Sequence, residues 1–204
     1  PIKPADSIRL YSPSRLDTLY EEAPLSPGGY QKAVERIRDH AFDRESLVEA
    51  LVSYNRSIGN DALAEESALS LLRPDVYATV TGQQPGFMGG PSFTILKALT
   101  ALAVAKRYGG PAIFWIASED HDLDEVSNTW TVDDAGNMRK FRLGRTFSGT
   151  ALEDVELGEK GVLAIASFIR EMHVAFDFSI CSSYTKTMAS FLAKLFKGTG
   201  LLFI

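Results

Sequence analysis

The sequence is poor in cysteine, with Cys181 as the single example among 204 residues. One cysteine cannot form a disulfide within the chain, which excludes the disulfide-stabilised domains and favours a reducing compartment, the cytoplasm. No apolar run approaches the roughly 20 residues that a membrane-spanning helix needs, and the first residues lack the pattern of a secretory signal peptide. The formal net charge of −5 disfavours nucleic acid as a partner. We therefore expect neither a membrane nor a nucleic-acid partner.

The strongest motifs for nucleotides and metals are also missing. The sequence contains neither the Gly-Lys-Ser/Thr ending of a P-loop nor a GxGxxG fingerprint. Its three histidines are His40, His121 and His173, too far apart in sequence to form a paired metal-binding motif such as HxxxH. Apolar residues make up 45% of the chain and charged residues 23%, which is typical of a globular protein with a sizeable core.

The most informative stretch runs from Val76 to Glu125. An apolar, β-branched run over Val76–Thr81 comes first, followed by a glycine-rich loop, Gly82–Pro91. Apolar residues then recur at helical spacing over Ser92–Tyr108, and Ala112–Ala117 forms a second apolar run. Strand, loop, helix and strand in this order predict a βαβ unit, and therefore an α/β fold with a parallel sheet.

The flanking segments complete the predicted domain organisation. Residues 1–74 are expected to form an N-terminal arm and helices that pack on the core, and residues 75–204 the first part of the core itself. A β-hairpin, predicted from two alternating runs around a turn, lies in an inserted segment, residues 127–158. The other predicted helices are Gly28–His40, Arg44–Ile58, Asn60–Leu72, Glu159–Met172 and Ser182–Lys197, and a helical turn is expected at Ser14–Tyr20. The last strand is predicted at Gly200–Ile204, and residues 144–158 are expected to form a loop or an edge strand. Because the chain starts at Pro1 and stops in a strand, we expect the N-terminal part of a longer protein.

The glycine-rich loop is the first candidate site. Loops and helix starts that follow parallel strands meet at one edge of the sheet, where ligands bind. Glycines there are expected to adopt positive φ and to let the backbone approach a ligand, while the free N–H groups of the helix favour an anion. Lys97 could reach back to that anion, and the two glutamines could bind hydroxyl or amide groups. The alternative is a tight structural turn. The residues concerned are Gly82, Gln83, Gln84, Gly86, Gly89, Gly90 and Pro91.

The second candidate is the acidic segment that follows Trp115-Ile116-Ala117, a run expected to be buried. It contains Glu119, Asp120, His121 and Asp122, with two more carboxylates at Asp124 and Glu125. Neighbouring carboxylates raise the pKa of a histidine and of each other, which is how a general acid or base is tuned. The same groups could hold a divalent metal, or form a solvated acidic loop.

The pair of motifs TGQQPGFMGGP and FWIASEDHDLDE resembles the family of the bacillithiol biosynthesis cysteine-adding enzyme, BshC. The likeness extends through the helix and the hairpin to the final GLLFI, in a family whose members are much longer. It implies a Rossmann-like core similar to class I aminoacyl-tRNA synthetases, and a homodimer formed by a C-terminal coiled coil outside this sequence. The expected reaction joins cysteine to glucosaminyl-malate, with ATP or ADP as the cofactor suggested. The sequence has no HIGH tetrapeptide in the loop, which departs from the synthetase pattern.

Together these arguments predict a ligase site. His121, with Asp120 and Asp122, is the predicted catalytic group that orients the amine or moves its proton. Glu119 and Asp120 are expected to bind an ammonium group, Ser118 and the glycine loop with Lys97 complete the substrate site, and no metal is predicted. Two alternatives stay open: a non-catalytic module that binds a sugar or nucleotide, and a metal-dependent hydrolase that uses the carboxylates.

Overall fold

The computed structural model describes residues 27–144, 149–177 and 183–204. These residues fall into two compact units, which divide between Asp43 and Arg44. The first unit is represented by helix α3 (Pro27–Arg38), which was predicted at Gly28–His40. The helical turn predicted at Ser14–Tyr20 lies outside the described residues.

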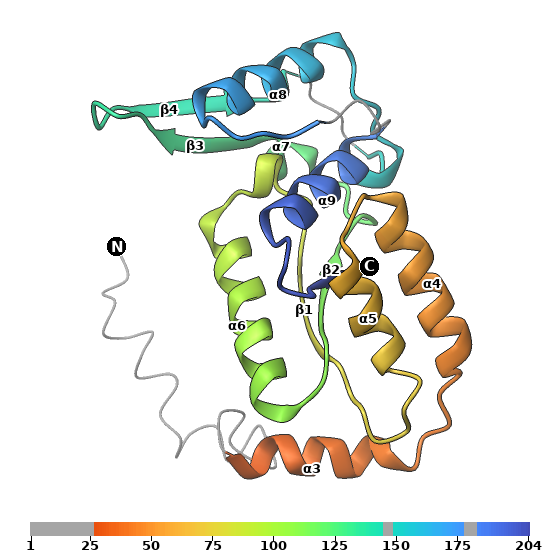
Figure 1. The fold of residues 1–204 in the computed structure, drawn as a ribbon. Helices are drawn as coiled ribbons and strands as arrows, with labels where there is room; N and C mark the ends of the chain where they lie inside the picture. The colour runs from red at the N-terminus through yellow and green to blue at the C-terminus, as the bar shows by residue number, and fades with distance from the viewer. Residues whose placement is uncertain (1–26, 145–148, 178–182) are drawn as a thin grey trace. The chain divides into compact units, whose positions relative to one another are not determined.

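A parallel three-stranded sheet forms the centre of this unit (Figure 1). Its strands are β1 (Thr79–Gln83), β2 (Ala112–Ile116) and β5 (Leu202–Phe203), in the order β1-β2-β5. The connection from β1 to β2 contains helix α6 (Ser92–Tyr108), so the predicted βαβ unit is confirmed. The first strand begins three residues later than predicted, and the last one is shorter.

Helix α6 has the predicted bounds because both of its ends carry local signals. Pro91 at the N-cap has its φ fixed at a value that suits a helix start. Gly109 ends the helix in the left-handed region, with φ of 83°, and its N–H donates to the Ala105 carbonyl. The alanines at 98, 101 and 105 are buried, and their small side chains let the helix pack closely on the sheet.

The two faces of the sheet are covered by different helices. Phe114 and Phe203 pack under α6 and α9 (Tyr184–Leu195), while Ile113 and Leu202 pack under α4 (Arg44–Ser57) and α5 (Ala62–Ser70). Trp115 was predicted to be core, and this prediction is wrong, because 53% of the residue is exposed. It lies two residues after Ile113 on the same face, beyond the part of the sheet that α4 and α5 cover.

A second core lies beyond the carboxyl ends of the strands (Figure 1). It contains the predicted hairpin, observed as β3 (Asn128–Val132) and β4 (Met138–Arg142), together with α7 (Leu123–Val126) and α8 (Glu159–Glu171). Two short 3₁₀ helices contribute, η1 (Phe87–Gly89) and η2 (Leu152–Asp154), the latter in a segment predicted as loop or edge strand. Buried residues of α9 belong to both cores, so this helix joins the sheet to the hairpin region. In the described part of the chain, no helix has the length and apolarity to cross a membrane.

Candidate functional site

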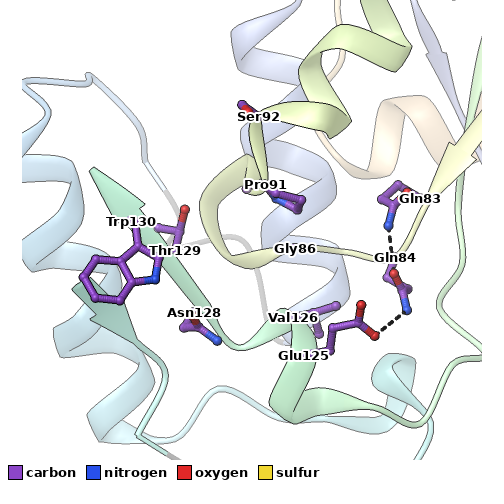
Figure 2. Close-up of a pocket in the computed structure, with 11 residues that line it drawn as sticks. Gln83, Gln84, Gly86, Pro91, Ser92, Glu125, Val126, Asn128, Thr129 and Trp130 are labelled. Carbon is purple, nitrogen blue, oxygen red and sulfur yellow. Dashed lines mark hydrogen bonds between the residues drawn. The ribbon is translucent and has the colours of Figure 1, made fainter. Parts of the chain in front are cut away.

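A cavity of about 400 Å³ opens at the carboxyl end of β1, where the sequence placed the site (Figure 2). The glycine-rich loop and the start of α6 form one wall, and α7 with the beginning of β3 forms the other. The end of the acidic segment, at Glu125, and the residues that follow it therefore meet residues of the glycine loop. The lining consists of Gln83, Gln84, Gly86, Gly90, Pro91, Ser92, Glu125, Val126, Asn128, Thr129 and Trp130.

The glycines of the loop do not have the predicted conformations, except for Gly89 with φ of 78°. A Cβ on Gly86 would overlap the Gly90 carbonyl oxygen, and one on Gly90 would overlap the Thr129 hydroxyl. At Gly82 the obstacle would be the Trp115 carbonyl oxygen, 2.9 Å away. These glycines are thus required by close approach of the protein to itself, and the prediction that they serve positive φ is wrong for all three.

The loop is held in place by its apolar residues. Phe87 and Met88 are buried in the second core, where the Phe87 ring meets Phe168 edge-on at 6.2 Å between centroids. The Met88 N–H donates to the sulfur of Met188 on α9. Burial of one such side chain contributes about 1.5–3 kcal/mol. The loop is therefore a fixed wall of the cavity, anchored from behind.

A chain of side-chain hydrogen bonds crosses the site from α6 to α7. Lys97 donates to the Gly82 carbonyl oxygen at 2.9 Å and to Gln83 Oε1 at 2.8 Å. Gln83 Nε2 in turn donates to Gln84 Oε1 at 2.8 Å. The ammonium of Lys97 is thus bonded to the end of β1, and it does not line the cavity as an anion-binding group.

The end of this chain fixes the amide of Gln84. Its Nε2 donates to Asp120 Oδ2 at 2.9 Å and to Glu125 Oε2 at 3.3 Å. The orientation of both amides follows from Lys97, because an ammonium can only donate and must face the oxygen of Gln83. Both hydrogens of the Gln84 amide nitrogen are consequently directed at carboxylates. Figure 2 shows the bond to Glu125.

Asp120 is the most strongly bonded carboxylate of the acidic segment. The Asp122 N–H donates to its Oδ1 at 2.9 Å, and Gln84 donates to its other oxygen. The Asp122 N–H, followed by the Gln84 amide, holds the pKa of the Asp120 carboxyl below its ordinary value. The prediction that the clustered carboxylates raise one another's pKa is therefore wrong for Asp120, because hydrogen bonds to its charged form dominate.

Asp120 and the other predicted residues of the acidic segment all lie outside the lining of the cavity. Asp122 is the N-cap of α7, where its side chain accepts from the Glu125 N–H at 3.1 Å. Ser118 donates to a carboxylate oxygen of Glu153 at 3.1 Å, and the segment is further fixed by the backbone of η2. Glu119 and His121 are exposed. The structure thus brings Asp120 to the glutamines and leaves His121 exposed on the loop between β2 and α7.

Several lining residues were not predicted as site residues. Glu125 was counted among the carboxylates of the segment without being singled out, and Ser92 was assigned only to the helix. Asn128, Thr129 and Trp130 were assigned to the hairpin, and their alternation gave no sign that the start of β3 turns toward the glycine loop. The one available signal was distance along the chain, since the hairpin follows the acidic segment directly.

The residues described in 27–144, 149–177 and 183–204 contain no group of three histidine, cysteine, aspartate or glutamate side chains arranged to hold a metal ion. Two of the carboxylates that would be needed are already engaged, Asp120 by Gln84 and Asp122 by the backbone of α7. The geometry therefore lends no support to the metal-dependent hydrolase.

Comparison with known proteins decides the family. The family model described as "Bacillithiol biosynthesis BshC, N-terminal Rossmann-like domain" matches residues 9–204. The chain belongs to the BshC family. Its domain is Rossmann-like, in agreement with the parallel sheet and the helices on both of its faces.

Curated relatives carry the name "Putative cysteine ligase BshC". One from Chlorobium phaeobacteroides is 32% identical over 205 aligned positions, covering 88% of this chain and 35% of the relative. Another from Bacillus cytotoxicus is 25% identical over 95% of this chain and 39% of its own length. A third, from Symbiobacterium thermophilum, is 42% identical over 62% of this chain and 22% of the relative. The chain thus spans about a fifth to two fifths of the length of these relatives.

Proposed function

We propose that this BshC-family protein is a ligase that adds cysteine to glucosaminyl-malate in the last step of bacillithiol synthesis. The observation that carries the proposal is the family match over residues 9–204, joined to a cavity at the carboxyl end of β1. That edge is where Rossmann-like sheets bind their ligands. The domain described above supplies one part of the active site.

The roles of individual residues follow from amide-bond formation, which needs an activated carboxyl and an unprotonated amine. In the proposal, Ser92 and the first N–H groups of the 17-residue helix α6 bind an anionic group of a substrate or of an ATP or ADP molecule. His121 takes up the proton of the amine at the edge of the site. Asp120 and Asp122 hold the loop on which His121 lies, through Gln84 and the start of α7.

The remaining expectations belong to the same proposal. Glu119 and Ser118 contribute from the loop after β2, and Gly82, Gly89 and Lys97 support the wall behind the lining residues. We also propose that the protein forms a homodimer through a coiled coil outside this chain and that it is located in the cytoplasm.

The test uses a full-length protein that contains this chain. It is incubated with cysteine and glucosaminyl-malate, with and without ATP, and bacillithiol is detected by mass spectrometry. Product that requires ATP supports the ligase and a nucleotide in the reaction. Binding of the substrates without product under any condition supports instead the non-catalytic binding module.

The proposed role of His121 is tested separately. His121→Ala and His121→Gln are expected to lower kcat by about 10²–10⁴-fold, the range for loss of a general acid or base, with a smaller effect on KM. His173→Ala is the control, since His173 follows α8 and does not line the cavity. Unchanged turnover in both His121 variants would contradict the role.

A further inference from the structure

The cavity has an unusual charge balance. Of the described residues that line it, Glu125 is the only one with an ionisable side chain, and none is lysine or arginine. The nearest ammonium in the network, that of Lys97, is bonded to Gly82 and Gln83. The cavity therefore carries a negative charge at the α7 wall, with no described cation in its lining to balance it.

The Glu125 carboxylate can accept more hydrogen bonds than it receives from the described residues. A carboxylate can accept about four hydrogen bonds, and within the described residues only the Gln84 amide donates to this one, at 3.3 Å. No ion pair to Glu125 is found in the described part of the chain, whereas its neighbour Asp124 lies 3.6 Å from Arg142 Nη2. The Glu125 side chain is directed into the cavity, next to Gln84 (Figure 2).

Glu125 is also held in position. Its N–H donates to the Asp122 side chain, and α7 is buried through Leu123 and Val126 in the second core. The bond from Gln84 restrains the carboxylate itself, since the amide is fixed by the chain that begins at Lys97. The Glu125 carboxylate is exposed, and on the wall of the cavity, restrained by this bond, it is suited to bind a cation with several donors.

We infer that Glu125 binds a primary ammonium group of a substrate, and that it is a specificity-determining residue of this site. The inference rests on the proposed function for the identity of the substrates. Both contain an amine, cysteine through its α-amino group and glucosaminyl-malate through its glucosamine, so the shared chemistry is an ammonium that donates to a carboxylate. Acceptors beside it, such as the Asn128 side chain, lie in the same lining.

The test compares Glu125→Gln with wild type in a full-length protein. Glutamine removes the charge but keeps an oxygen that can accept from Gln84. Binding is measured by calorimetry for cysteine, for glucosaminyl-malate, and for analogues that lack the amine, 3-mercaptopropionate and glucosyl-malate. We expect Glu125→Gln to weaken binding of one amine substrate by roughly 10- to 100-fold, the range for a charge-assisted hydrogen bond, and to leave binding of its deaminated analogue unchanged.

The matched control is Asp124→Asn, an equal change of charge at the adjacent position of α7, outside the cavity lining. It is expected to bind both substrates as wild type does. The substrate whose affinity falls identifies the ammonium that Glu125 binds. Equal affinities for wild type and Glu125→Gln, or an equal loss for the amine and its analogue, would overturn the inference.

Turnover is measured on the same samples, which separates the two proposals. If product forms but Glu125→Gln binds both substrates as wild type does, the ligase proposal is supported and the ammonium site is contradicted. Selective loss of amine binding without product from wild type would keep the ammonium site and contradict the ligase. Failure of wild type to discriminate either amine from its analogue would count against the ammonium site.

Discussion

At the scale of single residues, the orientation of the amides at the site is set by the Lys97 ammonium, which can donate hydrogen bonds but cannot accept them. The Lys97 ammonium contains no acceptor atom, so the group of Gln83 that faces it must be the amide oxygen. The amide nitrogen of Gln83 then donates to the amide oxygen of Gln84. The result is that Gln84 turns its nitrogen toward Asp120 and Glu125. A lysine outside the cavity lining thereby determines which groups of the cavity accept and which donate.

The first prediction concerns Gln84→Met, which removes the amide but keeps the length of the side chain. The pKa of Asp120 should rise toward its ordinary value of ~3.9, because one of the bonds that stabilise the carboxylate is lost. It should stay below that value, because the larger cause, the Asp122 N–H, remains. Carboxyl carbon NMR in a pH titration measures this directly. Asp133 is the internal control, since bonds from Asn137 lower its pKa independently.

The sign of the effect on stability follows from the lowered pKa of folded Asp120. Ionised Asp120 stabilises the fold above the unfolded value of ~3.9, and this stabilisation is lost as the pH falls through the lower folded value. Gln84→Met should therefore reduce the free energy of unfolding at neutral pH and make it less dependent on pH below ~4. An unaltered Asp120 pKa in the variant would show that Gln84 does not bind this carboxylate.

From the sequence, some residues of the site could be predicted, but the packing around individual residues could not. Gln83 and Gln84 were predicted as site residues because their amides, in the glycine loop after a strand, can bind hydroxyl or amide groups, and they do line the cavity. Trp115 was misjudged, since the coverage of its face depends on where α4 and α5 pack. Glu125 was not singled out because six acidic or histidine side chains in one short segment look alike until α7 directs one of them at the cavity.

At the scale of elements, the loop between β1 and α6 depends on glycine for a reason that spacing does not reveal. Gly86 has φ of −64°, which any residue adopts, but the Gly90 carbonyl occupies the place of a side chain. The loop closes on itself, and Phe87 and Met88 fasten it to the second core. The sequence indicated that glycines were needed, whereas the contact that requires them is tertiary.

The second prediction compares substitution by alanine at two glycines, Gly86 and Gly109, which should lower stability for different reasons. Gly86→Ala should destabilise the protein by about 2–3 kcal/mol or more, because overpacking against backbone cannot be relieved by a side-chain rotation. Gly109→Ala meets no atom within 4 Å, and its cost of about 1 kcal/mol comes from its φ of 83° alone. Urea unfolding at a constant m-value measures both. A smaller loss for Gly86→Ala would contradict the close approach within the loop.

Elements with local signals at both ends could be predicted well from the sequence. Helix α6 has its predicted bounds, set by Pro91 and Gly109. The hairpin strands, predicted from alternation over Ser127–Val132 and Met138–Leu143, were correct to within a residue at each end. Two short helices that lack such signals at both ends, α7 and η2, were not predicted. The helices α7 and η2 are short, and they form because Leu123 and Leu152 are buried against residues far away in the chain. Their positions determine one wall of the site, so that wall could not be predicted.

At the scale of the whole second unit, α9 is the element that unites the two cores. Ala189 and Leu192 pack against the sheet, while Met188 and Phe191 pack against the hairpin region. The cavity lies where these cores meet, with the loop after β1 on one side and the start of β3 on the other. A site assembled in this way keeps its shape only while both cores stay folded.

The third prediction is that both cores unfold together. The chain has two tryptophans, Trp115 in the sheet and Trp130 in the hairpin. Labelling with 5-fluorotryptophan gives each indole its own ¹⁹F resonance, which Trp130→Phe assigns. In a urea titration, the two resonances should lose their folded signals at the same midpoint, because separating the cores would expose the buried side chains of α9 at about 1.5–3 kcal/mol each. A lower midpoint for Trp130 would mean that the hairpin region opens independently.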